Sequence, residues 1–193
     1  MTKLLETIRI ESGRPLFLPY HEARMRRSRA ALWGLDEPIG LAERLRPPAR
    51  EGLWRCRVVY GRQIEQIEYL PYTPRPVRTL KLVYADIDYS LKYLDRSALE
   101  ALSAQKGEAD DILIVKAGLV TDTTIANIAF LRDGRWYTPQ HPLLEGTTRA
   151  RLLKEGRLIP AKITPDDIPR YEGFALLNAM IGFFPVKNGR ILF

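Results

Sequence analysis

The sequence predicts an α+β protein, because segments with strand periodicity and segments with helical periodicity both recur along its 193 residues. Residues 4–10 (LLETIRI) alternate apolar and polar side chains, which is typical of a half-buried strand. Residues 18–35 have helical spacing instead, and the turn-forming residues ESGRP separate the two segments. The apolar stripe expected on this helix consists of Met25, Ala30, Leu32 and Trp33.

Two further strands and a proline-rich segment follow the first helix. Residues 53–61 and 63–72 are expected to form a strand pair around a glycine turn. Residues 71–80 hold three prolines, a composition typical of a linker. We therefore expect two lobes, a small N-terminal α/β lobe of residues 1–78 and a larger C-terminal lobe of residues 79–193.

The second lobe mixes helices with hairpins, and we find no internal repeat in it. Its expected elements are a strand at 80–85, a helix at 95–107, hairpin-rich strands across 110–139 with turns at 116–118 and 133–134, a helix at 146–156, and a short helical turn followed by a strand within 159–180.

Composition excludes several classes of protein. The chain is 46% hydrophobic and 27% charged, and no apolar run approaches the roughly 20 residues of a membrane span. The first residues alternate and carry two acids, so we expect no signal peptide. The single Cys56 excludes an internal disulfide and fits a reducing cytoplasm. With only His21 and His141 as imidazole ligands, we expect no metal centre.

The net charge of +7 indicates an acidic partner. Basic residues are spread along the chain among Asp and Glu, with the densest group in residues 21–34. The chain contains no zinc finger, no ribonucleoprotein-type aromatic motif and no basic tail. The charge therefore fits a small anionic ligand about as well as a polynucleotide.

The stretch PLLEGTTRARLLKEG places a glycine and two hydroxyls ahead of a basic helix. One interpretation is an ordinary capped helix, since Thr is a common N-cap. The other is an anion site, because a helix N-terminus offers unpaired N–H groups and a positive dipole end. In that case Gly146, Thr147 and Thr148 would hold a phosphate.

Three charged residues are candidates for chemistry. Lys92 sits among apolar and aromatic neighbours, where a lysine can form a Schiff base or act as a base, although an exposed lysine has the same local pattern. Asp122 follows an apolar strand and could pair with a buried cation or cap a turn. Arg24 shares its helix with Arg26, Arg27 and Arg29, and at least two of these four must be surface charges.

Together, a lysine amine, an acid, an arginine and a Gly-Thr-Thr helix start match the needs of pyridoxal 5′-phosphate (PLP). The chain resembles the class IV (fold type IV) PLP enzymes, which include branched-chain and D-amino acid aminotransferases and 4-amino-4-deoxychorismate lyase. The resemblance covers essentially the whole chain, as a short member lacking the family's usual N-terminal segment. It implies PLP as cofactor between two α/β lobes, and a homodimer.

The resemblance also implies roles for individual residues. ETIRIESGRPLFLPYHEARMRRS resembles the family's opening strand and His-x-x-Arg helix, LKYLDR its lysine motif, GLVTDTTIANIAF its acid segment, and NAMIGFFPV its closing loop. The implied roles are phosphate binding for Arg24, Gly146, Thr147 and Thr148, the Schiff base for Lys92, the ring nitrogen for Asp122, and a loop beside phosphate and substrate for Asn178, Ala179 and Met180. Asp122 stands where the family typically has Glu, and Asp95 replaces the usual Asn.

For the reaction, LKYLDR and NAM…FFPV resemble the lyase pattern, which implies elimination of pyruvate to give 4-aminobenzoate, a folate precursor. The implied substrate is a small anionic amino compound. Arg55 and Arg57 lie on one strand face and are either carboxylate partners or outward-facing charges. A branched-chain or D-amino acid aminotransferase is the alternative, followed by a non-catalytic PLP-binding or nucleic-acid-binding protein.

Overall fold

The computed structural model describes residues 2–48 and 51–193, which form two compact units. Unit 1 comprises Met1–Pro74 and Leu91–Asp95, and unit 2 comprises Arg75–Ser90 and Arg96–Phe193. The division after Pro74 lies close to the boundary expected after residue 78. Whether each unit folds as an independent domain stays a prediction.

The segment Leu91–Asp95 belongs to unit 1, although we expected the second lobe to carry Lys92. Its backbone runs beside the first strand of the chain. Leu5 N donates to Lys92 O and Leu94 N donates to Lys3 O, both at 2.9 Å. These hydrogen bonds are non-local, so the order of residues along the chain could not reveal them.

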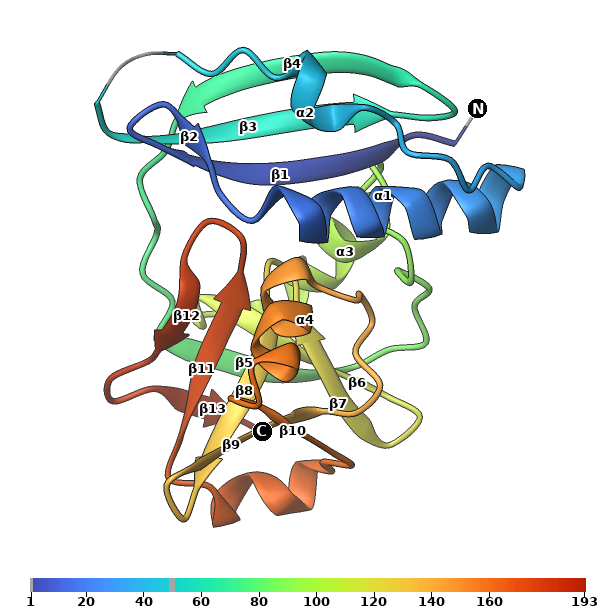
Figure 1. The fold of residues 1–193 in the computed structure, drawn as a ribbon. Helices are drawn as coiled ribbons and strands as arrows, with labels where there is room; N and C mark the ends of the chain where they lie inside the picture. Colours follow the sequence, from blue (N-terminus) through green and yellow to red (C-terminus); the bar gives the residue numbers. More distant parts are fainter. Residues whose placement is uncertain (1, 49–50) are drawn as a thin grey trace. The chain divides into compact units, whose positions relative to one another are not determined.

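Unit 1 is an antiparallel sheet in the order β2-β1-β3-β4, with helix α1 running along one face (Figure 1). Its elements are β1 (Leu4–Glu11), β2 (Arg14–Pro15), α1 (Leu18–Trp33), α2 (Leu41–Arg44), β3 (Leu53–Tyr60) and β4 (Ile64–Pro71). The alternation of β1 sends Leu4, Ile8 and Ile10 into the core, where each is fully buried.

Helix α1 confirms the helical prediction. Of the expected apolar stripe, Met25 is fully buried, Leu32 and Trp33 are partly buried and pack against the core, and Ala30 is only partly buried. The other buried residues of α1 are polar: His21, Arg24, Ser28 and Arg29. Polar side chains can be buried here because the unit supplies partners for them; Arg29, for example, donates to the carbonyl oxygens of Arg62 and Glu37.

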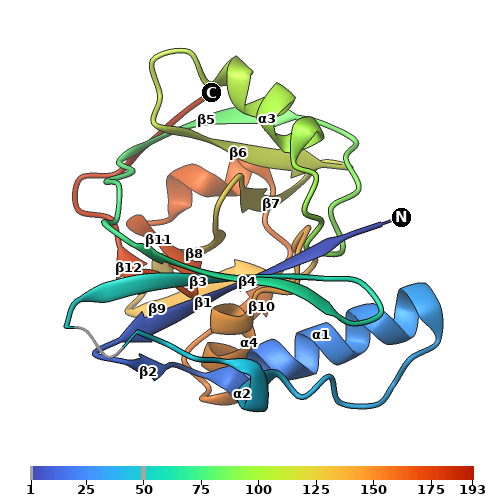
Figure 2. The same ribbon diagram turned by 90° about the horizontal axis from the view of Figure 1, so that it is seen from above.

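Unit 2 is built on a mixed sheet in the order β10-β9-β8-β7-β6-β5-β13, and β11 pairs with both β8 and β12. Figure 2 shows helix α3 lying along β5 and β6. The elements are β5 (Thr79–Tyr84), α3 (Ser97–Ser103), β6 (Asp111–Lys116), β7 (Leu119–Thr123), β8 (Asn127–Arg132), β9 (Arg135–Pro139), α4 (Thr147–Lys154), β10 (Ile159–Ala161), β11 (Gly173–Asn178), β12 (Gly182–Pro185) and β13 (Arg190–Leu192), with short 3-10 turns at Ala104–Lys106 and Pro165–Arg170. This mixture confirms the predicted α+β class.

The two expected hairpin turns join β6 to β7 and β8 to β9. Ala117 and Gly118 have φ of 50° and 76°, and Asp133 and Gly134 have φ of 51° and 69°. Two successive residues with positive φ form the turn whose twist matches that of the flanking strands. Asp and Gly tolerate this conformation well, which is why the second turn was recognisable in the sequence.

No helix among residues 2–48 and 51–193 is long and apolar enough to cross a membrane.

Gly189 marks a tightly packed point in the core of unit 2. A Cβ added there would lie 2.5 Å from Cε1 of Phe174, a ring that is 3% exposed. We expect Gly189→Ala to lower the free energy of unfolding by about 1–3 kcal/mol, because a packed core resists added volume. Gly173→Ala is the control, since nothing lies within 4 Å of its added Cβ. Urea unfolding of both variants measures the effect, and equal stabilities would contradict the packing argument.

Candidate functional site

The carboxylate of Asp122 is buried near the end of β7, where the side chain is 4% exposed. Asn127 lies directly opposite on β8 and donates from Nδ2 to Oδ1 of Asp122 at 2.8 Å. The backbone N–H of Leu144 donates to Oδ2 at 2.9 Å. Both oxygens are therefore held, one by the neighbouring strand and one by the turn that leads to α4.

Burial raises the pKa of Asp122 to about 7. The hydrogen bonds from Asn127 and Leu144 and the charge of Arg149 lower the pKa, but they offset only part of this effect. Arg149 is 3% exposed and donates to the carbonyl of Pro139 at 2.8 Å. A carboxyl group with a pKa near 7 changes its charge near neutral pH, so a positively charged partner would favour its ionised form.

Helix α4 begins with two buried threonines. Gly146 occupies the N-cap position and Thr147 and Thr148 are the first two residues, so neither threonine is the N-cap that one of the two interpretations required. They are 6% and 5% exposed, and among the residues that the structure describes their hydroxyl groups make no hydrogen bond. Threonine hydroxyls and unpaired N–H groups at a helix start are suited to binding an anion.

Gly146 also fits the side chain of Asn127. Its backbone has φ of −68° and ψ of 142°, a conformation open to other residues. A Cβ at this position would overlap Oδ1 of Asn127. The resemblance implies that Gly146 lets the backbone approach a ligand closely. The structure adds a second reason for glycine here, because any larger side chain would overlap Asn127.

The turn between β11 and β12 contains the remaining expected residues of unit 2. Asn178 accepts hydrogen bonds at Oδ1 from the N–H groups of Met180 and Ile181, both at 2.9 Å. Its Nδ2 donates to the carbonyl of Ile125 at 3.2 Å, in the loop that follows Asp122. Ala179 is partly buried and Met180 is 4% exposed. Asn178 therefore shapes its own turn and ties it to the next loop.

In unit 1, Arg24 is 6% exposed and forms a two-point ion pair with the fully buried Glu6. Its Nε donates to Oε1 at 2.8 Å and its Nη2 to Oε2 at 2.6 Å. Nδ1 of His21 lies 2.6 Å from the same Oε2. Burial alone would raise the pKa of Glu6, but Arg24 and His21 lower it to about 2. Burial distinguishes Arg24 from the exposed Arg26, which local sequence could not do.

Lys92 lies outside regular structure, ahead of α3, and its side chain is partly buried. Arg55 and Arg57 share one face of β3, as expected, and both are partly buried. Nη1 of Arg57 donates to Glu68 at 2.9 Å. The guanidinium of Arg55 lies 5.7 Å from the ring centroid of Tyr72.

The structure thus joins the expected residues of unit 2 into one network. Asp122 and the start of α4 are linked through Asn127 and Leu144, and Asn178 reaches the loop after Asp122. The expected residues of unit 1 are Arg24, Arg55, Arg57 and Lys92. The sequence reasoning missed four buried participants: Glu6, His21, Asn127 and Arg149. Two local signals pointed to them: the His-x-x-Arg spacing from His21 to Arg24, and the five-residue spacing from Asp122 to Asn127 across a tight loop between strands.

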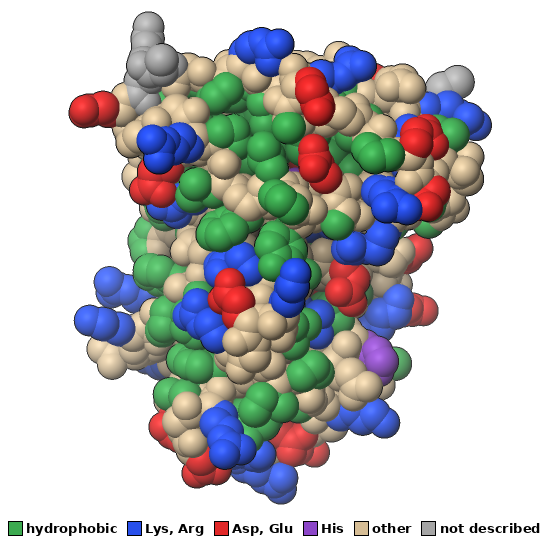
Figure 3. Space-filling model, viewed as in Figure 1, with side chains coloured by type: hydrophobic (Ala, Val, Ile, Leu, Met, Phe, Trp, Pro, Cys, Tyr) green, Lys and Arg blue, Asp and Glu red, His purple; other side chains and the backbone are tan. Residues whose placement is uncertain are grey.

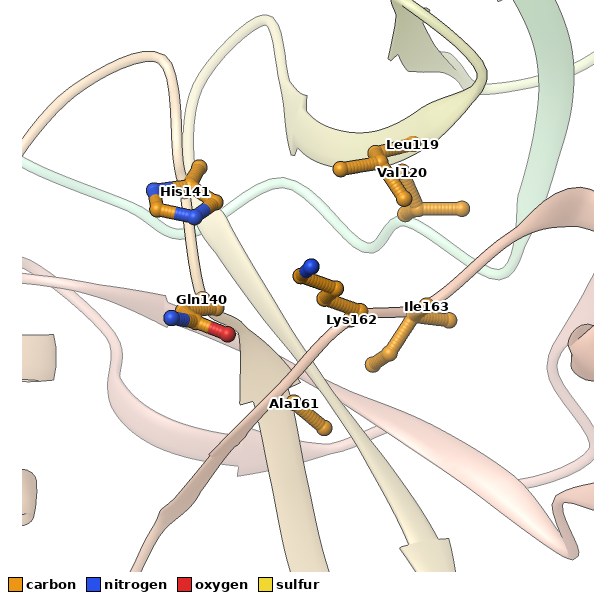
Figure 4. A pocket seen from close by; sticks show the side chains of 7 residues that line it. All are labelled: Leu119, Val120, Gln140, His141, Ala161, Lys162 and Ile163. Carbon is orange, nitrogen blue, oxygen red and sulfur yellow. The ribbon is translucent and has the colours of Figure 1, made fainter.

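Other surface features are weaker candidates. A hollow in unit 2 is lined by Leu119, Val120, Gln140, His141, Ala161, Lys162 and Ile163 (Figure 4), but it encloses no space for a water molecule. Basic and acidic side chains are interspersed on the face drawn in Figure 3. Within residues 2–48 and 51–193, no three His, Cys, Asp or Glu side chains are grouped to hold a metal.

The raised pKa of Asp122 predicts a pH-dependent stability of the protein without cofactor. Between about pH 4 and pH 7 the folded state keeps a proton that the unfolded state has released, so stability falls as the pH rises. Asp122→Asn removes this titration. From pH 4.5 to pH 7.5 we expect the wild type to lose about 2–4 kcal/mol of unfolding free energy relative to this variant.

Urea unfolding at the two pH values measures the difference. Asp86→Asn, at a side chain that is 95% exposed, is the control and should follow the wild type. Parallel curves for the wild type and Asp122→Asn would contradict the expected titration.

Comparison with known proteins agrees with the arrangement of these elements. A model of the amino-transferase class IV family matches residues 88–188. An uncharacterised protein of Haemophilus influenzae is 39% identical over 188 residues, which cover 94% of this chain and 100% of that protein.

Two solved structures share the fold. A protein of Haemophilus somnus, provisionally named a 4-amino-4-deoxychorismate lyase, is 39% identical with a TM-score of 0.88, covering 94% of this chain and 98% of its own. A protein of Mesorhizobium loti, provisionally named an amino-acid aminotransferase, is 26% identical with a TM-score of 0.81, covering 100% of both chains. These matches confirm the fold type IV prediction, and the chain belongs to the amino-transferase class IV family.

Proposed function

We propose that this protein is a PLP-dependent enzyme of the 4-amino-4-deoxychorismate lyase type. It would eliminate pyruvate from an anionic amino substrate and leave 4-aminobenzoate. The observation that carries the proposal is the buried acid Asp122, joined through one turn to a helix start whose first two residues are buried threonines. Membership of the class IV family supports the choice of cofactor.

The residues present fit PLP by their chemistry. The pyridine nitrogen of PLP carries a proton readily, and a buried carboxyl with a pKa near 7 would ionise against that charge. The phosphate is a dianion, which the N–H groups, Thr147 and Thr148 at the start of α4 can bind. The aldehyde needs a primary amine, and Lys92 is the amine that the family motif marks.

When bound, PLP supplies an electron-accepting ring that stabilises negative charge on the substrate carbon next to the amine. Asp122 would hold the proton on the ring nitrogen in place. Arg24, held by Glu6, would add positive charge toward the phosphate. Lys92 would anchor the cofactor and then move the substrate's α-proton with its freed amine.

Support for the lyase reaction comes from the LKYLDR motif and from the H. somnus structure, whose provisional name is that of the lyase. Arg55 and Arg57 are the proposed partners of substrate carboxylates, and Asn178, Ala179 and Met180 are proposed to lie beside the cofactor. A class IV aminotransferase remains the second candidate, favoured by the likeness to the M. loti structure. We propose that the working form is a homodimer, as the family resemblance implies.

The first test of the proposal is covalent labelling. After addition of PLP the protein should turn yellow, and borohydride reduction followed by peptide mapping should place the pyridoxyl group on Lys92. Lys92→Ala should abolish both signals, because no amine remains at that position, whereas the exposed Lys154→Ala should keep both. A colourless protein, or label scattered over surface lysines, would contradict the proposal and favour the non-catalytic alternative.

The reaction itself is tested by product analysis. With 4-amino-4-deoxychorismate, the PLP-loaded protein should release pyruvate and 4-aminobenzoate in equal amounts, with no need for a 2-oxo acid. A transaminase would instead transfer the amino group of an amino acid to a 2-oxo acid. Transfer without pyruvate release would replace the lyase by the second candidate.

A further inference from the structure

We propose that Asn127 is a positioning residue that couples the acid Asp122 to the anion-binding start of α4. Its amide would set the carboxylate and the helix start as one unit, and Gly146 would be the complementary surface that lets the amide fit. This inference rests on the proposed function, in which Asp122 binds the ring of the cofactor and the start of α4 binds its phosphate. Asn127 would set the distance between these two binding groups.

The donor side of the amide makes the first half of the link. Nδ2 of Asn127 donates to Oδ1 of Asp122 at 2.8 Å and to the carbonyl of Leu144 at 2.9 Å. An NH₂ group has two N–H bonds, so both are used. Leu144 in turn donates its N–H to Oδ2 of Asp122 at 2.9 Å. Asn127, Asp122 and Leu144 thus form a closed ring of three hydrogen bonds.

The acceptor side of the amide makes the second half. Oδ1 of Asn127 packs against the Cα of Gly146, at the position where a Cβ would overlap it. Gly146 is the N-cap of α4 and is followed directly by Thr147 and Thr148. The same side chain therefore holds Asp122 by a hydrogen bond from its nitrogen and packs against the start of α4 with its oxygen.

Burial makes this link rigid. Asn127 is 5% exposed and Asp122 is 4% exposed, so water cannot readily replace a lost hydrogen bond. No conservative replacement keeps all the contacts. Asp at position 127 would lose both N–H donors and place a second carboxylate beside Asp122. Ala would leave Oδ1 of Asp122 and the carbonyl of Leu144 without this donor.

The test is a double-mutant cycle between positions 127 and 146, read in ligand affinity. The variants are Asn127→Ala, Gly146→Ala and the pair together, each compared with wild type in Kd for PLP by absorption and for inorganic phosphate by calorimetry. Each single change should weaken binding of both ligands by about tenfold, a scale typical of residues that orient a binding group.

The decisive result is non-additivity. In the Asn127→Ala background the Cβ of Gly146→Ala has space, so the second change should cost little more affinity. Asn127→Asp should weaken binding of both ligands, because its added charge lies beside Asp122 and against Gly146 at the proposed phosphate site. Thermal unfolding identifies the variants that are folded, and only these are compared in affinity. Gly173→Ala is the control for replacing a glycine, since nothing lies within 4 Å of its added Cβ.

Two failures are distinguishable. Wild type that binds PLP and phosphate, with Asn127→Ala equal to it or with strictly additive losses in the cycle, would overturn the coupling alone. Wild type that binds neither ligand would overturn the proposed function and this inference with it.

Discussion

The burial of the Asp122 carboxylate constrains the rest of the candidate site. A carboxyl group with 4% exposure needs hydrogen-bond donors, and it takes them from two segments that are distant in sequence, β8 through Asn127 and the turn before α4 through Leu144. Satisfying one side chain therefore fixes where α4 begins. The buried start of that helix, with Thr147 and Thr148 as its first residues, follows from this anchoring.

Unit 1 contains a comparable arrangement with a different purpose. Its helix packs a polar stripe against the sheet, and Arg24 is held by the buried carboxylate of Glu6. Buried ion pairs add little stability over apolar packing, because both charges lose hydration. An apolar stripe would have held this helix at least as well. The pair fixes the direction of the Arg24 guanidinium, which apolar packing would not do.

Local pattern explains what could be predicted from the sequence. Strand alternation, helical spacing and the Asp-Gly turn depend on neighbouring residues, and the structure confirms the elements they indicated. The polar part of the buried face of α1 could not be predicted, because Arg24 and Arg26 look alike until the sheet supplies Glu6 to one of them. The contacts of Lys92 with β1 and the fit of Asn127 to Gly146 join distant segments, so no periodicity encodes them.

Asp122 is one methylene shorter than the Glu that is typical of the family. It is compatible with its proposed role because its carboxyl group is buried. Burial favours the neutral carboxyl, and ionisation becomes favourable once a cation arrives in the same low-dielectric surroundings. A neutral ring offers no such compensation, since the charged acid would remain unpaired there. We therefore expect the proposed site to favour a protonated ring over a neutral one. The hydrogen bonds from Asn127 and Leu144 hold the carboxylate in one orientation, as the proposed role requires.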